Sequence, residues 1–450
     1  MRQAFTENNL RKIYDYENRK GVNLEGMFFP ELQTETDTLK KIAASFRQLK
    51  AKKGTLSPAK YIEARDALNQ QKLKTKEKKE KQLSLALSKI SDEILRGSFN
   101  LTLNKLTLPT GKIAYGPDKT CAVSYFAIKQ VQQNIRSIYK VKQENRNHII
   151  SQLMTLLSDP LPKWVLRLDV KSFFESIPHK VLLEKLSKDA VLSYTSQRVI
   201  QRILSEFRRV SQSGVGIPRG VGVSAYLSEL YMREFDRTVT QLDNVIYYAR
   251  YVDDIIAIFS PHNVKTINDI LRLVEKELNK IQLSLNMSKV SLHDISTPKN
   301  DKFEYLGYRI SFGNGQVETK MSSKKFNRYK ERIRLSLYEF DRCYAFDYNR
   351  ASKILYCRLK FLTGNTRLYN SKKHILTGMY FSNEHLTDYS DLNALDAYLR
   401  SLVSLNPRIK SDLKTRIQEL SFKEGYVEKA FYLFSTKGLA KITKAWKNVA

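Results

Sequence analysis

The residues best suited to chemistry in this 450-residue chain are two adjacent carboxylates, Asp253 and Asp254. They separate two short apolar runs rich in β-branched and aromatic residues, Val245–Tyr251 and Ile255–Phe259. Runs of this length and composition predict a β-hairpin with the acids at its turn. Neighbouring carboxylates repel each other, so a bound cation would explain the pair, and Mg²⁺ prefers carboxylate and phosphate oxygens. The alternative is a solvated turn that contains two Asp residues.

A third carboxylate, Asp169, ends a β-branched and Leu-rich run that begins at Val165. A carboxylate at the end of a buried strand is costly unless it meets a cation. The alternative is an Asp that caps the helix expected beyond Pro178. Between Asp169 and the acid pair, Gly214–Gly222 forms a Gly-rich turn that opens a helix, Val223–Asp236, where an anionic substrate could approach the backbone closely.

Composition limits the partners. The chain has 77 Lys and Arg residues against 46 Asp and Glu residues, a net charge of +31, which favours a polyanionic partner. Its apolar runs fall short of the roughly 20 residues that span a bilayer, and the N-terminal stretch lacks a signal-peptide apolar region. We therefore expect nucleic acid and no membrane. The three cysteines, Cys121, Cys343 and Cys357, lack CxxC spacing, which argues against zinc and suits a reducing cytosol.

The first hundred residues are predominantly helical and charged. The helical pattern runs from Thr36 to about Leu95, with a break at Ser57–Pro58. Its Lys-rich part, Lys72–Lys81, is either a solvated helix face or a helix that binds nucleic-acid phosphates.

A strand-rich segment follows. Lys112 and Lys119 lie in or beside turns of a hairpin expected within Leu101–Ala122. Two amphipathic helices come next, over residues 123–140 and 144–158, and Arg146 lies on the second. Beyond the acid pair the pattern predicts a helix, a second apolar hairpin with the sequence FEYLGYRISF, and a helical, basic and aromatic region from residue 322 to the end.

Taken in order, five segments resemble the motifs of a reverse-transcriptase palm. They are Arg167–His179, Gly216–Met232, Tyr251–Asp254 (YVDD), Leu285–Lys289 (LNMSK) and Glu304–Tyr308 (EYLGY). The resemblance covers residues 106–312, and the order of the motifs is its strongest part. It implies an α+β right-hand polymerase, with fingers, a palm whose antiparallel sheet carries the catalytic acids, and an α-helical thumb-like C-terminal domain.

This resemblance gives four expected domains. Residues 1–100 would form an N-terminal basic helical extension and 101–163 the fingers. Residues 164–320 would form the palm, with part of the fingers between 180 and 213, and residues 321–450 the helical thumb.

The implied activity is that of an RNA-directed DNA polymerase, a nucleotidyltransferase that uses two Mg²⁺ ions, with Mn²⁺ as a substitute. Asp169 and Asp253 would bridge both ions, Asp254 would support them, and Val170 would add a further ligand. Phe174, five residues after Asp169, matches the position of the family's steric gate, where a ring would clash with a ribose 2′-hydroxyl.

The remaining site residues also follow from the resemblance. Lys289 is a candidate general acid towards pyrophosphate, or else a surface lysine. The other nucleotide-binding candidates are Lys112, Lys119 and Arg146 from the fingers, and Arg219 and Gly220 in the Gly-rich loop. Leu306 and Gly307 are the expected primer grip.

Arg219 departs from the retroviral pattern, in which Gln usually follows the Pro of this loop. The departure points to bacterial defence-associated reverse transcriptases, the abortive-infection and unknown-group classes, which Asn145–His179 and Arg358–Asn383 resemble most. That class implies phage defence in the bacterial cytoplasm, with a noncoding RNA as template or scaffold and dNTPs converted into a DNA product. A second reverse transcriptase or a second copy of this chain stays open as a partner.

Other functions also stay open. They are a retron- or group II intron-type reverse transcriptase, a template-independent or protein-primed DNA polymerase, and a non-catalytic nucleic-acid-binding assembly protein. The region after Ser322 contains neither an RNase H carboxylate cluster nor a Cys/His endonuclease motif. Its helices would hold a nucleic acid by its phosphates or pack against a second subunit.

Overall fold

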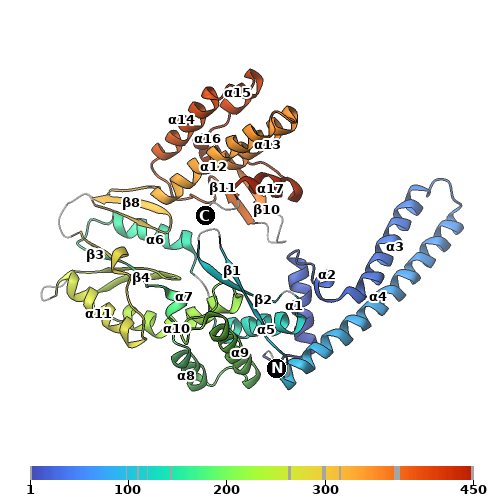
Figure 1. The fold of residues 1–450 in the computed structure, drawn as a ribbon, viewed down its shortest axis with the longest axis horizontal. Helices are drawn as coiled ribbons and strands as arrows, with labels where there is room; N and C mark the ends of the chain where they lie inside the picture. The colour runs from blue at the N-terminus through green and yellow to red at the C-terminus, as the bar shows by residue number, and fades with distance from the viewer. Residues whose placement is uncertain are drawn as a thin grey trace. The chain divides into compact units, whose positions relative to one another are not determined.

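The computed structural model describes residues 3–446, apart from residues 98, 109–110, 119, 142–143, 262–264, 296–300, 314–315 and 369–374. Within this part the fold mixes helices with four small sheets, so the expected α+β class is confirmed at that level (Figure 1). The chain divides into two compact units. The first comprises residues 1–106, 115–141 and 179–227, and the second comprises residues 107–114, 142–178 and 228–450. The four expected domains stay a prediction, because this division does not test them.

The first unit is mainly helical. Its elements are α1 (Glu7–Arg19), α2 (Leu24–Phe28), the 3-10 turn η1 (Pro30–Leu32), α3 (Gln33–Ala51), α4 (Pro58–Arg96), α5 (Ala122–Ile138), α8 (His179–Asp189), α9 (Tyr194–Ser211) and the start of α10 (Gly222–Thr240). The expected first hairpin is present as β1 (Leu103–Thr107) and β2 (Ile113–Pro117).

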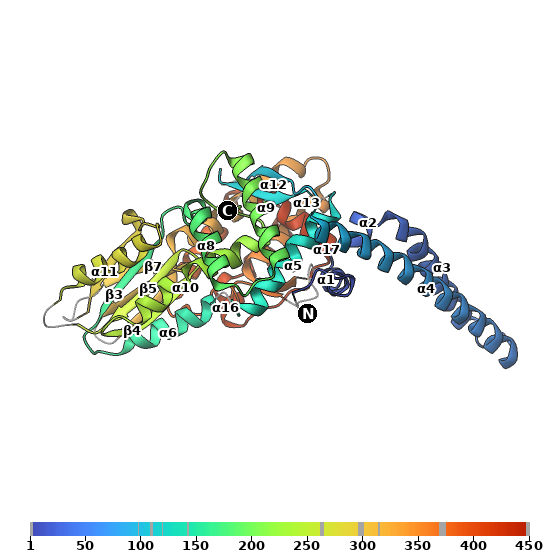
Figure 2. The ribbon, with the colours of Figure 1, turned by 90° about the horizontal axis from the view of Figure 1, so that it is seen from below.

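Helices α3 and α4 form a hairpin, and they lie side by side in both views (Figures 1 and 2). The break expected at Ser57–Pro58 is present, with Pro58 in the first turn of α4, where its missing N–H costs nothing. The 39-residue α4 ends at Gly97, whose left-handed φ of 72° suits a residue without a Cβ.

The second unit is built on a four-stranded antiparallel sheet with the order β4-β5-β3-β6. Its strands are β3 (Trp164–Asp169), β4 (Val245–Tyr251), β5 (Asp254–Phe259) and β6 (Ser291–Asp294). β3 and β5 are the inner strands and are buried along almost their whole length, which explains their continuous apolar sequences. Helix α11 (Ile267–Lys280), started by a capping box of Thr266 and Asp269, lies along this sheet (Figures 1 and 2).

A second sheet and a set of helices share one hydrophobic core in this unit. The sheet has the order β7-β8-β9, formed by β7 (Asp301–Tyr305), β8 (Tyr308–Gly313) and β9 (Gln316–Met321). The helical elements that contribute to this core are α6 (Arg146–Ser158), α12 (Ser323–Cys343), α13 (Tyr348–Thr363), α14 (Ser390–Leu405), α15 (Ser411–Gln418), α16 (Phe422–Val427), α17 (Thr436–Thr443) and η3 (Lys444–Trp446). The short elements α7 (Phe173–Ser176) and η2 (Met287–Lys289) also belong to this unit.

The structure differs from the sequence-based expectation after residue 322, because this region is not helical throughout. Strands β10 (Asn365–Leu368) and β11 (Ile375–Gly378) pair antiparallel, with Asn365 opposite Gly378. Four-residue strands are too short to reveal a period of two in the sequence. Gly378 has a φ of 135°, and a Cβ there would approach the Asn365 Cα to 2.4 Å, so this pairing requires glycine. No helix in the described residues is both long and apolar enough to cross a bilayer.

Candidate active site

Asp169 and Asp254 face each other across neighbouring strands of the four-stranded sheet. Asp169 is the last residue of β3, Asp254 is the first residue of β5, and the β3–β5 register pairs them directly. Directly opposed residues on antiparallel strands hold their Cβ atoms about 4.5–5.5 Å apart. Two acids that are 85 positions apart in the sequence therefore meet at one end of the sheet.

The turn between β4 and β5 consists of Val252 and Asp253. Val252 has a φ of 62°, a left-handed conformation that is costly for a β-branched side chain. The carbonyl of Asp253 accepts a hydrogen bond of 3.0 Å from the Val170 N–H, so the turn is tied to the residue that follows Asp169. Strand pairing and this hydrogen bond thus hold together the two backbone segments that carry the three acids and Val170.

Asp169 is 3% exposed, and both its carboxylate oxygens have partners in the LNMSK segment. Lys289 Nζ lies 2.8 Å from Oδ1, and Asn286 Nδ2 lies 3.1 Å from Oδ2. The segment is held in place by an isolated bridge between Val170 and Leu285, and the Asn286 N–H donates to the Asp169 carbonyl at 2.7 Å. The half-exposed Lys289 therefore neutralises a buried carboxylate.

The surroundings of Asp254 disfavour its charged form. Burial, together with the charges of Asp253 and Asp169, raises the pKa of the Asp254 carboxyl to about 6, although Arg167 and Lys289 oppose the shift. Arg167 Nη2 lies 3.5 Å from Asp254 Oδ1, and its Nη1 donates to the Lys289 carbonyl at 3.2 Å. A cluster of this kind favours added positive charge.

The donor chemistry fits a hard divalent cation. In the described part of the chain, no three His, Cys, Asp or Glu side chains surround one point as metal ligands. The types and backbone positions of Asp169, Asp253 and Asp254 nevertheless suit such an ion, because carboxylate oxygens are its preferred ligands and the charged form of Asp254 is disfavoured without one.

Sequence reasoning missed a buried network that supports this turn. Arg250 on β4 donates from Nη1 to the Val252 carbonyl at 2.9 Å, from Nε to Asp236 at 2.8 Å and from Nη2 to Glu229 at 2.6 Å. Tyr248 also donates to Asp236, at 2.6 Å. A detectable signal existed, since Arg250 stands within a run of apolar and aromatic residues, where an unpaired guanidinium would be costly.

Phe174 lies in the short helix α7, just beyond Asp169, and is partly exposed, whereas its neighbour Phe173 is 2% exposed. The two rings make an edge contact, with centroids 5.5 Å apart. Core packing therefore explains Phe173. It does not explain Phe174, whose role as a steric gate stays a prediction.

Leu306 and Gly307 form the two-residue turn between β7 and β8, with φ values of 45° and 79°. The Arg146 Nε donates to the Leu306 carbonyl at 2.7 Å, and its guanidinium lies 5.1 Å from the centre of the Tyr308 ring. Lys325 Nζ lies 5.2 Å from the same centre. Arg146, expected among the triphosphate-binding residues of the fingers, thus lies against the expected primer grip.

The other nucleotide-binding candidates lie on other parts of the chain. Arg219 and Gly220 belong to the first unit, where the Arg219 carbonyl accepts from the Tyr115 N–H at 2.6 Å. Lys112 is exposed at the end of the β1–β2 hairpin, and its carbonyl accepts from the Leu108 N–H at 2.8 Å. Lys119 lies outside the described residues.

The middle of the chain matches the model of one known protein family. Residues 121–310 match the family model described as "Reverse transcriptase (RNA-dependent DNA polymerase)". This stretch contains all three acids, Lys289 and the turn at Leu306–Gly307. The chain therefore carries a reverse-transcriptase domain, a domain of RNA-directed DNA polymerases. No curated protein sequence matches the chain.

Solved polymerase structures show only distant likeness. Apo telomerase from Candida tropicalis is 13% identical, over 77% of this chain and 61% of that chain, with a TM-score of 0.38. Telomerase from Candida albicans, in complex with a TWJ fragment of telomeric RNA, is 10% identical over the same shares, with a TM-score of 0.35. The RNA-dependent RNA polymerase of BmCPV at its elongation state is 11% identical, over 52% of this chain and 24% of that one, with a TM-score of 0.30. The chain thus spans about three fifths of each telomerase chain.

Proposed function

We propose that this protein is an active reverse transcriptase, which adds dNTPs to a DNA strand copied from RNA. One observation carries the proposal. Asp169 is paired with Asp254 at one end of a sheet, beside Asp253, inside the segment that matches the reverse-transcriptase family. Three neighbouring carboxylates disfavour each other's charged form, so they would not be grouped to stabilise the fold. Such a group is suited to binding cations and phosphates.

Asp169, Asp253 and Asp254, with the Val170 carbonyl, would hold two Mg²⁺ ions, for which Mn²⁺ could substitute. When bound, these ions would supply Lewis acidity to the attacking 3′-oxygen and to the leaving phosphate. Among the chain's own residues, Lys289 balances the charge of Asp169. It would also act as the proton donor towards a leaving pyrophosphate. The Arg250 network fixes the carbonyl of the Val252 turn, and thereby the direction of the two acids that follow.

Two further positions would select and hold the substrates. The partly exposed ring of Phe174 would exclude a ribose 2′-hydroxyl by steric clash. The turn at Leu306–Gly307 would hold the end of the growing strand, with Arg146 beside it to contact a phosphate. Arg219, Gly220, Lys112 and Lys119 stay candidates for contacts to the incoming nucleotide.

We also propose that the enzyme acts in phage defence in the bacterial cytoplasm, with a noncoding RNA as template or scaffold. The supporting features are the resemblance of Asn145–His179 and Arg358–Asn383 to defence-associated enzymes and the net charge of +31. A second reverse transcriptase or a second copy of this chain would complete the assembly.

The test of the polymerase proposal is primer extension on an RNA template of defined sequence, with sequencing of the DNA product. The expected product complements the template and requires all four dNTPs. A product whose sequence ignores the template would contradict RNA-directed synthesis and favour the template-independent alternative. Sequencing the RNA that copurifies with the protein tests the defence proposal, since a dedicated partner would dominate the bound pool.

A further inference from the structure

The hairpin of α3 and α4 carries a concentration of positive charge that the catalytic proposal does not use. Between residues 38 and 76 the chain has eleven Lys and Arg residues and two acids, Glu63 and Asp66. All eleven cationic side chains are exposed. Two of them have an ion-pair partner among the described residues, Lys40 with Asp37 and Arg65 with Asp66. We call this stretch, residues 38–76, the distal arm.

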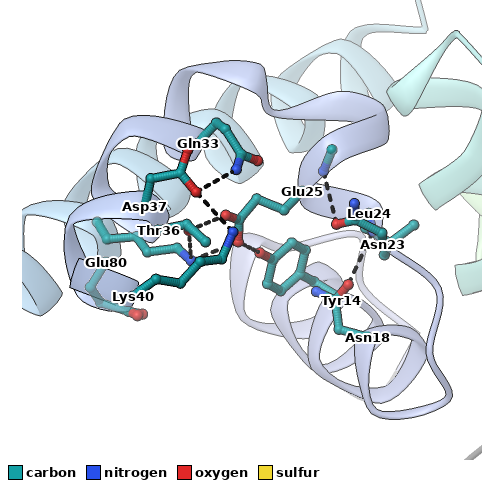
Figure 3. Close-up of polar contacts among 12 residues, drawn as sticks. Tyr14, Asn18, Asn23, Leu24, Glu25, Gln33, Thr36, Asp37, Lys40 and Glu80 are labelled. Atoms are coloured by element: carbon teal, nitrogen blue, oxygen red, sulfur yellow. Dashed lines mark hydrogen bonds and ion pairs between the residues drawn. The ribbon is translucent and has the colours of Figure 1, made fainter. Parts of the chain in front are cut away.

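The base of the same hairpin is different, because acids pair with two of its lysines, Lys78 and Lys79. Lys79 Nζ lies 2.6 Å from Glu25 and 2.5 Å from the Thr36 hydroxyl. Glu25 also accepts from Tyr14 at 3.2 Å, and Figure 3 shows these two side chains together with Thr36. Lys78 pairs with Glu35 at 2.8 Å. The run Lys72–Lys81 is thus not one uniform surface, since Lys78 and Lys79 pair with acids and the lysines at its N-terminal end have no ion-pair partner among the described residues.

The core of the protein does not require the distal arm. Every buried residue of α4 lies between Leu83 and Ile94, and Ile42 is the one buried position among residues 38–76. Like charges gathered on a slender two-helix structure repel each other and destabilise it. A surface of this kind is explained by a polyanionic partner, whose bound counterions are released when lysines replace them.

The aromatic residues of the distal arm favour a double helix over a single strand. Proteins that bind single strands stack the bases on exposed rings. The rings here, Phe46 and Tyr61, are half-buried, and Lys72 and Lys53 lie over them at 5.6 Å and 5.9 Å. Phosphate contacts without base stacking match the way in which double-stranded RNA is recognised, by its shape and backbone.

We propose that the distal arm binds the phosphate backbone of a double-helical stem in a structured RNA. The choice of RNA rests on the proposed function, in which an RNA is template or scaffold. The distal arm belongs to the first unit, whereas the three acids belong to the second, so the two proposals concern different surfaces.

The test compares two charge-matched variants of α4. Lys72→Gln/Lys76→Gln removes two unpaired distal charges that lie one helical turn apart on one face. Lys81→Gln/Lys89→Gln removes two exposed charges from the base of the same helix. Binding is measured as a function of salt, without dNTPs, to an RNA duplex of about 20 base pairs, the same sequence as DNA, and single-stranded RNA. Thermal unfolding followed by circular dichroism checks that both variants are folded.

The distal variant should bind the RNA duplex about tenfold more weakly near 0.15 M salt, and its log–log salt slope should be shallower by 1 to 2. The basal variant should stay within about twofold of wild type. Equal loss in both variants, or none in the distal one, would overturn the proposal, as would tighter binding of the DNA duplex or of the single strand. Primer extension on a short template should be equal in all three proteins, so a failure of the polymerase proposal would be seen separately.

Discussion

Arg250 and Val252 are joined by a hydrogen bond of 2.9 Å, from a buried guanidinium to the carbonyl of a residue in a left-handed conformation. The bond connects the strained turn that carries Asp253 to the acids Glu229 and Asp236 on α10. The direction of the catalytic turn thus depends on an ion-pair network behind it.

Replacing this arginine should therefore affect both stability and turnover. Arg250→Met leaves Glu229 and Asp236 without their cation, so the free energy of unfolding should fall by about 3–5 kcal/mol in chemical denaturation. Arg250→Lys keeps a charge and should recover part of this loss, but with a lower kcat at nearly unchanged KM, because the bond to Val252 is lost. Arg237→Met, at an exposed position on α10, is the control. Equal kcat in wild type and Arg250→Lys would contradict a positioning role.

Lys289 should matter for turnover more than for folding. Its ammonium is half-exposed and balances the buried Asp169 carboxylate. Lys289→Ala should lower the single-turnover rate of dNTP incorporation by about 10²-fold, the usual size of a general-acid contribution. Lys276→Ala, which removes an exposed lysine from α11, should leave the rate unchanged. A wild-type rate in Lys289→Ala would contradict a role of this lysine as general acid.

Phe174 should set sugar selectivity. Phe174→Ala removes the ring, so the preference for dNTPs over ribonucleotides should fall, by roughly 10–200-fold in the ratio of kcat/KM values. Phe174→Tyr keeps the ring and should keep most of the preference. Competition between dCTP and CTP on one template measures the ratio directly. Unchanged sugar selectivity in Phe174→Ala would contradict the assignment of Phe174 as the steric gate.

Lys325 should make stability depend on pH. Burial, helped by the charges of Arg146 and Arg328, lowers the pKa of this lysine to about 6. In the unfolded chain it stays protonated to about pH 10.4, so between these values the unfolded state binds the extra proton and stability rises with pH.

Lys325→Met should therefore remove part of this rise, and the stability of the variant relative to wild type should be greatest near pH 6 and shrink towards pH 9. Urea denaturation at several pH values measures the difference. The loss of the 2.6 Å bond from Lys325 to the Ser382 carbonyl changes the variant's free energy of unfolding by the same amount at every pH. The test is therefore how the difference between variant and wild type changes with pH. Lys324→Met, at an exposed site on the same helix, controls for the substitution itself. A difference that is constant with pH would contradict the lowered pKa.

Local patterns predicted much of this fold. The hairpin around Asp253 and Asp254, the turn at Leu306–Gly307 and the break at Ser57–Pro58 depend on neighbouring residues, and the structure has all three. The pairing of Asp169 with Asp254 followed only from the order of the motifs, since no local rule joins residues so far apart.

What the sequence could not supply was contact between distant side chains. The bond from Lys289 to Asp169, the Arg250 network and the place of Arg146 against Leu306 each depend on how separate segments pack. The strands β10 and β11 were missed because four residues carry too little periodicity. The two-part character of Lys72–Lys81 depends on acids from α2 and α3, which sequence spacing alone does not place beside it.

The most direct measurement is Mg²⁺-dependent dNTP incorporation by wild type and by Asp253→Asn/Asp254→Asn. The substitutions keep size and shape but remove the charge opposite Asp169 and the charge beside it in the turn, so incorporation should fall by about 10³-fold or more while the fold is retained. Asp243→Asn, an exposed site just before β4, should behave as wild type. Equal incorporation by wild type and the double variant would contradict the assignment of this site as the catalytic centre.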